Sequence, residues 1–151
     1  MDKFNSVEEI LIFAIEREQE AVNFYTRLSA NAKNDEMKKV FVEFAQEEVA
    51  HKARLTRIKE EHIYIFAPEK VLDLNISDYT VPDVITPDIS YQATLIVAMN
   101  REKAAFKLYT KLASKAEEPG LKDLFMSLAQ EESKHKLRFE IEYDEYVLKE
   151  N

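Results

Sequence analysis

Residues 18–51 begin with EQEAVNFY and end with EVAH, and residues 102–135 begin with EKAAFKLY and end with ESKH. Each stretch carries a glutamate, a tyrosine seven residues later and a closing Glu-x-x-His. The second set follows the first at a constant distance of 84 residues, so the two copies align without a gap. A duplicated pair of helices is the simplest explanation of this repeat.

The repeated residues lie on apolar stripes with helical spacing, in which steps of three and four residues alternate. In the first copy the stripes are Leu11, Ala14, Glu18, Ala21, Tyr25 and Leu28, then Met37, Phe41, Phe44, Glu48, His51, Leu55 and Ile58. In the second copy they are Leu95, Ala98, Glu102, Ala105, Tyr109 and Leu112, then Leu121, Phe125, Leu128, Glu132, His135 and Phe139. Each copy therefore predicts two amphipathic helices that pack as a hairpin.

The helices are predicted at about residues 6–30, 35–62, 89–116 and 120–149 of a single all-α domain that spans residues 1–151. Residues 63–88 hold most of the prolines and are too long for a tight turn, which predicts a connection that crosses the length of a four-helix bundle. The expected caps are Ser6 with Glu9 in a capping box, Asn34 or Asp35, and Asp88 or Ser90.

The composition limits the classes of function. Apolar residues make up 46% of the chain and charged residues 33%, with one glycine, which favours long helices in one folded domain. The net charge of −8, without a basic cluster that stands out, argues against nucleic acid and anionic membranes as partners. The absence of cysteine excludes disulfides and thiolate-bound metal. No signal peptide or membrane-spanning run is apparent, so we expect a cytoplasmic protein.

Buried carboxylates make the stripes chemically informative. A carboxylate inside a helical bundle costs several kcal/mol unless it is paired or bound to a cation. Two divalent ions would balance four glutamates, and the i, i+3 spacing lets a glutamate and a histidine of one helix reach one ion. Mixed carboxylate and imidazole ligands suit iron or manganese. The candidate ligands are Glu18, Glu48, His51, Glu102, Glu132 and His135. This is the ligand set of di-iron carboxylate bundles.

Some repeated residues allow a second interpretation. A single Glu-x-x-His on a helix is usually a surface ion pair, and only the duplication with an in-stripe glutamate favours a metal ligand. Glu47 and Glu131 lie one residue off the stripe, so solvent-facing support is favoured over metal ligation. Tyr25 and Tyr109 are either plain core tyrosines or hydroxyls that orient a ligand carboxylate.

With these motifs the sequence resembles the rubrerythrin branch of the ferritin-like superfamily, over about residues 6–149. The resemblance implies a ferritin-like four-helix bundle with a crossover between its second and third helices. It implies two iron ions per chain, with manganese or zinc as substitutes. In the roles that it implies, Glu18 and Glu102 are terminal ligands, Glu48 and Glu132 bridge the ions, His51 and His135 bind one ion each, and Tyr25 and Tyr109 match the tyrosines that support the ligands.

Two features depart from the typical pattern of that family. Typical rubrerythrins append a rubredoxin domain with a four-cysteine iron, whereas this chain has no cysteine. They also carry an extra glutamate on the third helix. The inward positions one turn either side of Glu102 are instead Ala98, Met99, Ala105 and Phe106.

The expected activity is that of a non-haem di-iron oxidoreductase, in keeping with an oxidative-stress protein. It would reduce hydrogen peroxide or O2 with electrons from a separate carrier, such as a rubredoxin-like protein. The alternatives are a ferroxidase or iron-handling protein, and a binding or sensing module stabilised by its metal. A homodimer is expected through outer helix faces, and Tyr143 and Tyr146 would either contribute to it or close the core.

Overall fold

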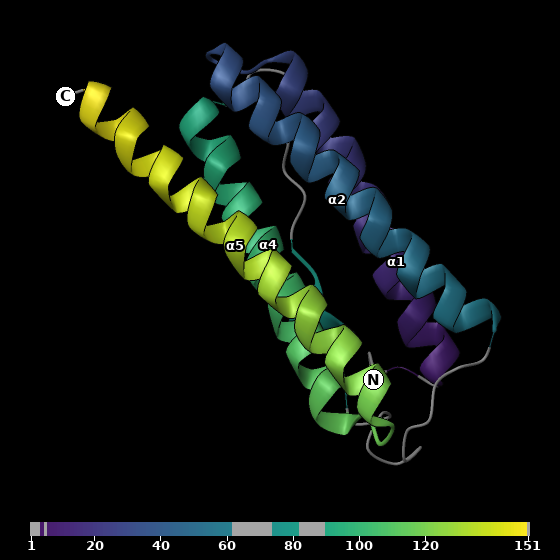
Figure 1. Ribbon diagram of the computed structural model, residues 1–151. Coiled ribbons are helices and arrows are strands. Elements are labelled where there is room, and N and C mark those ends of the chain that lie inside the picture. Colours follow the sequence, from purple (N-terminus) through teal and green to yellow (C-terminus); the bar gives the residue numbers. More distant parts are fainter. Residues whose placement is uncertain (1–3, 5, 62–73, 82–89, 151) are drawn as a thin grey trace. The chain divides into compact units, whose positions relative to one another are not determined.

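The computed structural model describes residues 4, 6–61, 74–81 and 90–150, with side chains up to residue 148. Within this part of the chain there are four α-helices and one short 3-10 helix (Figure 1). They are α1 (Val7–Ala30), α2 (Asp35–Glu60), η1 (Ile76–Tyr79), α4 (Tyr91–Lys115) and α5 (Pro119–Glu150). Each α-helix begins and ends within two residues of its predicted limits, so the all-α prediction is confirmed.

The helices pair in the order of the sequence repeat. The chain divides into two compact units, of which one spans Phe4–Leu72 and the other includes Asp73–Asn151. In the first unit α1 packs along α2, and in the second α4 packs along α5 and also contacts η1. Each copy of the repeat is therefore one helical hairpin, as predicted.

Side-chain caps fix where the helices begin. Ser6 Oγ accepts a hydrogen bond from the backbone N–H of Glu9 (3.1 Å), which confirms Ser6 as the cap of α1. For α2 and α4 the structure selects one residue from each predicted pair. Asn34 caps α2 through Met37 N–H (2.8 Å), and Ser90 caps α4 through Ala93 N–H (3.0 Å). These bonds satisfy backbone donors that the first helical turn leaves free.

The start of α5 is different, because Pro119 occupies its first position, where a missing N–H costs nothing. The Glu118 carboxylate accepts hydrogen bonds from the N–H groups of Gly120 (2.9 Å) and Leu121 (2.8 Å). A negative charge at this end also complements the helix dipole. Glu118 thus caps α5 at a position where the sequence has no serine or asparagine.

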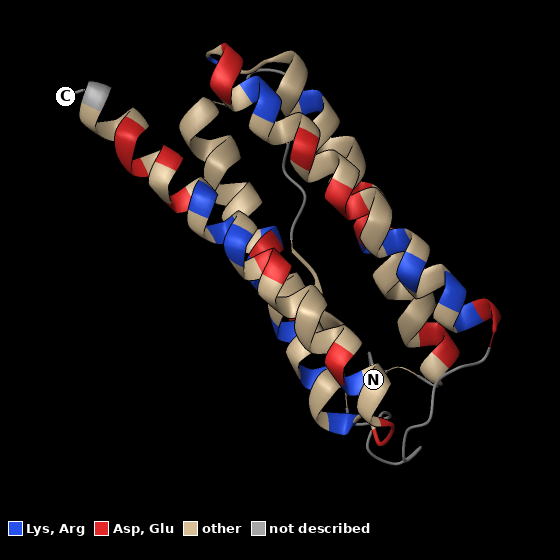
Figure 2. Ribbon diagram, viewed as in Figure 1, with Lys and Arg blue, Asp and Glu red and all other residues tan. Residues whose placement is uncertain are grey.

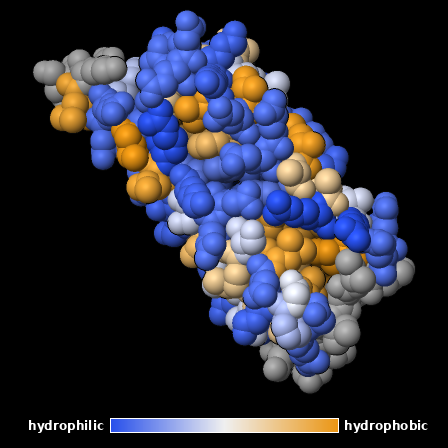
Figure 3. Space-filling model, in the orientation of Figure 1, coloured by the Kyte–Doolittle hydropathy of each residue, from blue (hydrophilic) through white to orange (hydrophobic). Residues whose placement is uncertain are grey.

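The predicted apolar stripes are buried, except that Phe44 and Ala105 are half-buried. The fully buried large side chains of the first hairpin include Ile10, Leu11, Tyr25, Phe41 and Leu55, and those of the second include Tyr109, Phe125 and Phe139. On the face drawn in Figure 3, hydrophilic residues predominate, and hydrophobic residues appear in separate groups. Among the described helices, none has the length and apolar character needed to cross a membrane.

Most of the predicted crossover, residues 63–88, lies outside the described residues, and only 74–81 can be reported. In this stretch Leu74 and Tyr79 are buried. The Lys107 ammonium lies over the Tyr79 ring, 5.9 Å from its centroid. Burial, assisted by the charge of Asp78, raises the pKa of Tyr79 above its ordinary value. Residues 74–81 therefore contact α4 through the cation–π interaction between Tyr79 and Lys107.

Candidate metal centre

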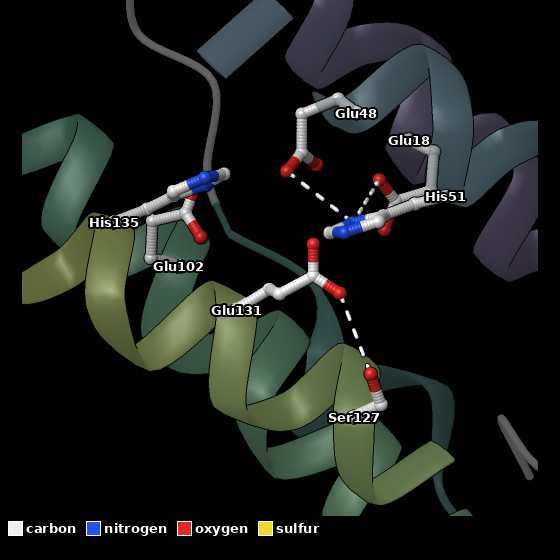
Figure 4. Close-up of polar contacts among 7 residues, drawn as sticks. All are labelled: Glu18, Glu48, His51, Glu102, Ser127, Glu131 and His135. Carbon is white, nitrogen blue, oxygen red and sulfur yellow. Dashed lines mark hydrogen bonds and ion pairs between the residues drawn. The ribbon is translucent and has the colours of Figure 1, made fainter. Parts of the chain in front are cut away.

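The first hairpin brings together Glu18 of α1 with Glu48 and His51 of α2, here called the first triad (Figure 4). His51 Nδ1 lies 3.5 Å from Glu18 Oε2 and 3.4 Å from Glu48 Oε1. All three side chains are buried, with exposed fractions of 2%, 1% and 0% respectively. The helical stripe explains this placement, because all three residues share the inward face with Leu11 and Phe41.

The second hairpin repeats the arrangement with Glu102 of α4 and with Glu132 and His135 of α5, here called the second triad. His135 Nδ1 lies 3.6 Å from Glu102 Oε1. One ligand atom from each of the three side chains falls within 4.8 Å of the others, and all three residues are buried. The residues selected by the sequence repeat are therefore assembled in the same way in both hairpins.

The distances within the triads suit a cation held between the side chains. Good hydrogen bonds to nitrogen are about 2.7–3.2 Å long, and the imidazole–carboxylate separations exceed this range. Ligand atoms bound at about 2.0–2.2 Å to one metal ion lie roughly 3–4.4 Å apart. The separations of 3.4–3.6 Å fall inside that interval. Oxygen and imidazole nitrogen are also donors that a divalent first-row metal accepts. The residues present thus fit a metal ion.

Both predicted tyrosines are buried beside aromatic rings. The Tyr25 ring meets Phe44 edge to face with centroids 5.9 Å apart, and the Tyr109 ring stacks on Phe125 at 6.4 Å. Their exposed fractions are 0% and 1%. These contacts place both rings in the core, and the role of their hydroxyls in orienting a ligand carboxylate stays a prediction.

The off-stripe glutamates differ from the triad glutamates in burial. Glu47 is exposed, and Glu131 is half-buried, with its Oε2 3.5 Å from the Ser127 hydroxyl that donates to it (Figure 4). Neither belongs to a group of residues with metal-ligand geometry among the described residues. This agrees with their predicted position beside the stripe.

Comparison with known proteins agrees with the geometry of the triads. The family model described as Rubrerythrin matches residues 9–143. The chain belongs to the rubrerythrin family. No curated protein matches the sequence at a significant level. The crystal structure of a Thermotoga maritima protein, described as a ferritin-like diiron-carboxylate protein, is similar with a TM-score of 0.77. The match covers 97% of this chain and 99% of that one at 23% sequence identity, which shows a shared fold and confirms the predicted ferritin-like fold.

Next to the first triad of this rubrerythrin-family chain, a side-chain hydrogen bond joins α2 to α1. This bond, here called the polar tie, was not predicted from the sequence. Lys52, which follows His51 on α2, donates a hydrogen bond from Nζ to Gln19 Oε1 on α1 (2.7 Å). Gln19 in turn donates from Nε2 to Asn23 Oδ1 (3.0 Å). Because Gln19 follows Glu18, the tie joins the neighbours of two triad residues. Its only signal in the sequence is that Lys52 and Gln19 each directly follow a residue of the first triad.

The second hairpin lacks the partners for the same tie. The repeat places Lys103 where the first hairpin has Gln19, and Lys136 where it has Lys52. Two ammonium groups cannot bond to each other, and Lys136 instead pairs with Glu140 of its own helix (3.0 Å). The two triads therefore consist of equivalent residues but have different surroundings.

A second feature missed by sequence reasoning lies near the amino end of α4. Glu142 is buried at 7% exposure, and its Oε2 accepts a hydrogen bond from the Tyr91 hydroxyl (2.9 Å). Partial burial, and then the bond and charge of Glu142, raise the pKa of Tyr91 well above its ordinary value. The Tyr146 ring packs on Tyr91 with centroids 5.1 Å apart, and the Tyr143 hydroxyl accepts a bond from Gln92 (3.0 Å). Tyr143 and Tyr146 thus make contacts within their own hairpin.

Proposed function

We propose that this member of the rubrerythrin family is a di-iron oxidoreductase that reduces hydrogen peroxide or O2. The observation that carries the proposal is the duplicated triad, which gives one buried imidazole and two buried carboxylates in each hairpin. Six such ligands, with four negative charges, suit two divalent ions in electrostatic balance. Iron is the proposed metal, because carboxylate and imidazole donors suit it and it can change oxidation state.

In this proposal the six residues keep the roles implied by the family resemblance. Glu48 and Glu132 would each be shared by the two ions, whereas Glu18 and Glu102 would each bind one ion. His51 and His135 would bind one ion each. When bound, two ferrous ions supply one electron each, which matches a two-electron reduction of peroxide. The burial of the ligands keeps bulk water away from the reacting atoms.

The electrons must come from outside the triads, because the chain has no cysteine to hold an iron–sulfur relay. A separate one-electron carrier, of the rubredoxin-like kind expected from the sequence, is the proposed partner. A homodimer is the proposed assembly. Neither nucleic acid nor a membrane takes part in the proposed reaction.

One observation favours a second candidate, iron oxidation followed by release of the iron. The residues one turn either side of Glu102 supply no further carboxylate on α4, since these positions hold Ala98, Met99, Ala105 and Phe106, of which Ala98 is buried and Phe106 is exposed. Typical members of the family use a third-helix glutamate to shift iron between redox states. A site without this glutamate has only the six triad residues to bind the iron in both of its oxidation states, so oxidised iron is held less firmly.

The deciding experiment is anaerobic loading with ferrous iron, followed by one stoichiometric addition of peroxide or O2. Absorbance then follows oxidation, and a chelator that captures only free iron follows release. Faster oxidation by peroxide, with iron retained, supports the oxidoreductase. Faster oxidation by O2 with iron released moves the assignment to a ferroxidase, and no spectral change with either oxidant indicates a structural metal.

A further inference from the structure

The carboxyl-terminal half of α4 carries an uninterrupted row of lysines. Residues 103–116 read KAAFKLYTKLASKA, so that a lysine recurs every fourth position and no acidic residue occurs among them. Figure 2 shows blue residues along this half of the helix. The lysine row consists of Lys103, Lys107, Lys111 and Lys115.

The row forms a ridge, because residues four apart are neighbours on the surface of a helix. Lys103, Lys107 and Lys111 are exposed, and Lys115 is half-buried. Across the described residues, the structure gives none of the four an ion pair with a carboxylate. Lys107 makes its ring contact with Tyr79, and the row otherwise presents its ammonium groups to the surroundings.

Helix stability alone does not account for this arrangement. Like charges at i, i+4 destabilise a helix by about 0.2–0.5 kcal/mol per pair. The helix dipole favours cations only within the last turn, which includes Lys115 and leaves Lys103, Lys107 and Lys111 unexplained. The equivalent positions of the first copy are Gln19, Asn23, Arg27 and Asn31, of which only Arg27 is charged. The row is therefore a property of one copy of the repeat and is not required by the shared fold.

We propose that the lysine row is the docking surface for a small acidic electron-transfer protein, an inference that rests on the proposed function. The chain as a whole has a net charge of −8 and repels an acidic partner. A row of four lysines that make no ion pair with the described carboxylates is an attractive region on that background. Complementary charge of this kind orients the partner and accelerates association.

The position of the row suits delivery of electrons to the second triad. Lys103 directly follows Glu102, so a partner seated on the row contacts the helix that carries a ligand. The distance between a partner seated on the row and the second triad is therefore on the order of the thickness of an α-helix with its side chains, about 10–12 Å. Phe106 is 41% exposed one turn after Lys103 and supplies an apolar contact beside the charges. Apolar contact within a polar rim is the usual composition of a protein interface.

The stoichiometry requires repeated docking. Reduction of one hydrogen peroxide to two water molecules takes two electrons and two protons. A one-electron carrier is oxidised once per visit, so two reduced carriers dock in turn for each peroxide. Weak, salt-sensitive binding with fast exchange serves such a cycle better than a permanent complex.

The test measures binding of the full chain to an acidic rubredoxin as the probe, without turnover, at ionic strengths of about 0.02 M and 0.5 M. The triple variant Lys103→Gln/Lys107→Gln/Lys111→Gln is compared with Lys38→Gln/Lys39→Gln/Lys59→Gln, which changes the net charge equally but on α2. We expect the wild-type chain to bind the rubredoxin at the lower ionic strength and to lose this binding at the higher one. The α4 variant should lose at least about ten-fold in affinity, and the α2 variant much less.

Three results would overturn the docking surface: no binding of the acidic probe to the wild-type chain, equal losses in both triple variants, or no loss in either. A single-stranded oligonucleotide is a second probe, and tighter binding of it to the row would mean that the partner is a nucleic acid. Circular dichroism confirms that each variant is folded. Because binding is measured without iron chemistry, its failure leaves the peroxide and metal-retention results of the proposed function unaffected.

Discussion

At the scale of single residues, the unusual feature is six ionisable side chains on faces otherwise occupied by leucine, alanine and phenylalanine. Glu18, Glu48, Glu102 and Glu132 are each at most 2% exposed. A helix hairpin would be more stable with apolar residues at these positions, because desolvation of a carboxylate costs several kcal/mol. The same desolvation cost recurs at positions 84 residues apart in the two copies, which stability alone does not explain and the proposed metal site would explain.

The assignment of ligands is testable by neighbouring substitutions. Glu48→Ala and Glu132→Ala should each lose or halve the bound metal, since each of these carboxylates is proposed to touch both ions. The matched controls Glu47→Ala and Glu131→Ala should bind nearly as much metal as the wild type. Metal analysis after gel filtration gives the number of metal ions bound per chain. Loss in the controls with retention in the first pair would shift the ligand register by one residue.

Tyr91 provides a prediction about pH. Its pKa is raised in the folded protein, so the folded state keeps the phenolic proton at a pH where the unfolded chain loses it. The contribution of Tyr91 to stability is therefore complete below the ordinary value of 10.0 and is lost as the pH rises above it. Between pH 9 and pH 11, roughly one unit either side of that value, the urea midpoint of the wild type should fall more steeply than that of Tyr91→Phe.

The same substitution also has an effect at neutral pH. Tyr91→Phe leaves the buried Glu142 carboxylate without its tyrosine donor, which should lower the free energy of unfolding by about 1–2 kcal/mol. A Tyr143→Phe variant is the control, because its hydroxyl accepts a bond at an exposed position. Parallel pH profiles for Tyr91→Phe and the wild type would contradict the assigned shift.

Residue patterns could predict the triads but could not predict the Tyr91–Glu142 bond. Every triad residue is in phase with an apolar stripe and has a partner in the other copy. Tyr91 and Glu142 are 51 positions apart, and the repeat equates them with Val7 and Ile58, which carry no polar group. A contact between two unrepeated residues is decided by tertiary packing, which single-sequence periodicity does not contain.

At the scale of elements, the limits of the helices followed from local chemistry. Ser6, Asn34 and Ser90 could be predicted as caps because a short polar side chain before an apolar stripe satisfies free N–H groups. The cap formed by Glu118 was not predicted, since glutamate is an uncommon residue in that role. The two hairpins also differ in that Lys52 bonds across two helices, whereas Lys136 bonds within one helix. This difference depends on side-chain partners, so it could not be predicted from the sequence pattern.

This contrast predicts unequal responses to equivalent substitutions. Lys52→Met removes a partly buried bond between α1 and α2 and should lower the free energy of unfolding by about 1 kcal/mol. Lys136→Met, at the same position of the repeat, removes a pair within α5 worth about 0.3–0.5 kcal/mol. Urea unfolding of the metal-free variants measures both changes. Equal losses would show that the tie across the first hairpin adds nothing.

At the scale of the whole molecule, metal should stabilise the folded chain, because the triads exist only after folding. A ligand present at 100 times its dissociation constant adds about 2.7 kcal/mol to the free energy of unfolding. The melting temperature should therefore rise on addition of ferrous iron or manganese under anaerobic conditions. The double variant Glu48→Ala/Glu132→Ala should show little or no rise. An unchanged wild-type melting temperature would argue against metal binding by the triads.

Assembly is the other property of the whole molecule that can be measured directly. A homodimer of the 17.7 kDa chain has a mass of about 35 kDa by light scattering. Because Tyr143 and Tyr146 already contact α4, their substitution should affect the hairpin itself more than the association. A monomer would remove the dimer from the proposal. A large hollow assembly would instead support iron storage.

The two copies of the repeat are joined in one polypeptide, and this has a consequence for how the protein can change. In an assembly of two identical hairpins, any substitution would appear on both sides at once. Within one chain, the inner face can stay matched while the outer faces drift apart independently. In the first copy Gln19 donates a hydrogen bond to Asn23, and at the equivalent positions of the second copy Lys103 and Lys107 are exposed. Covalent fusion thus lets the two hairpins keep matching residues on their inward faces while their outer faces take on different roles.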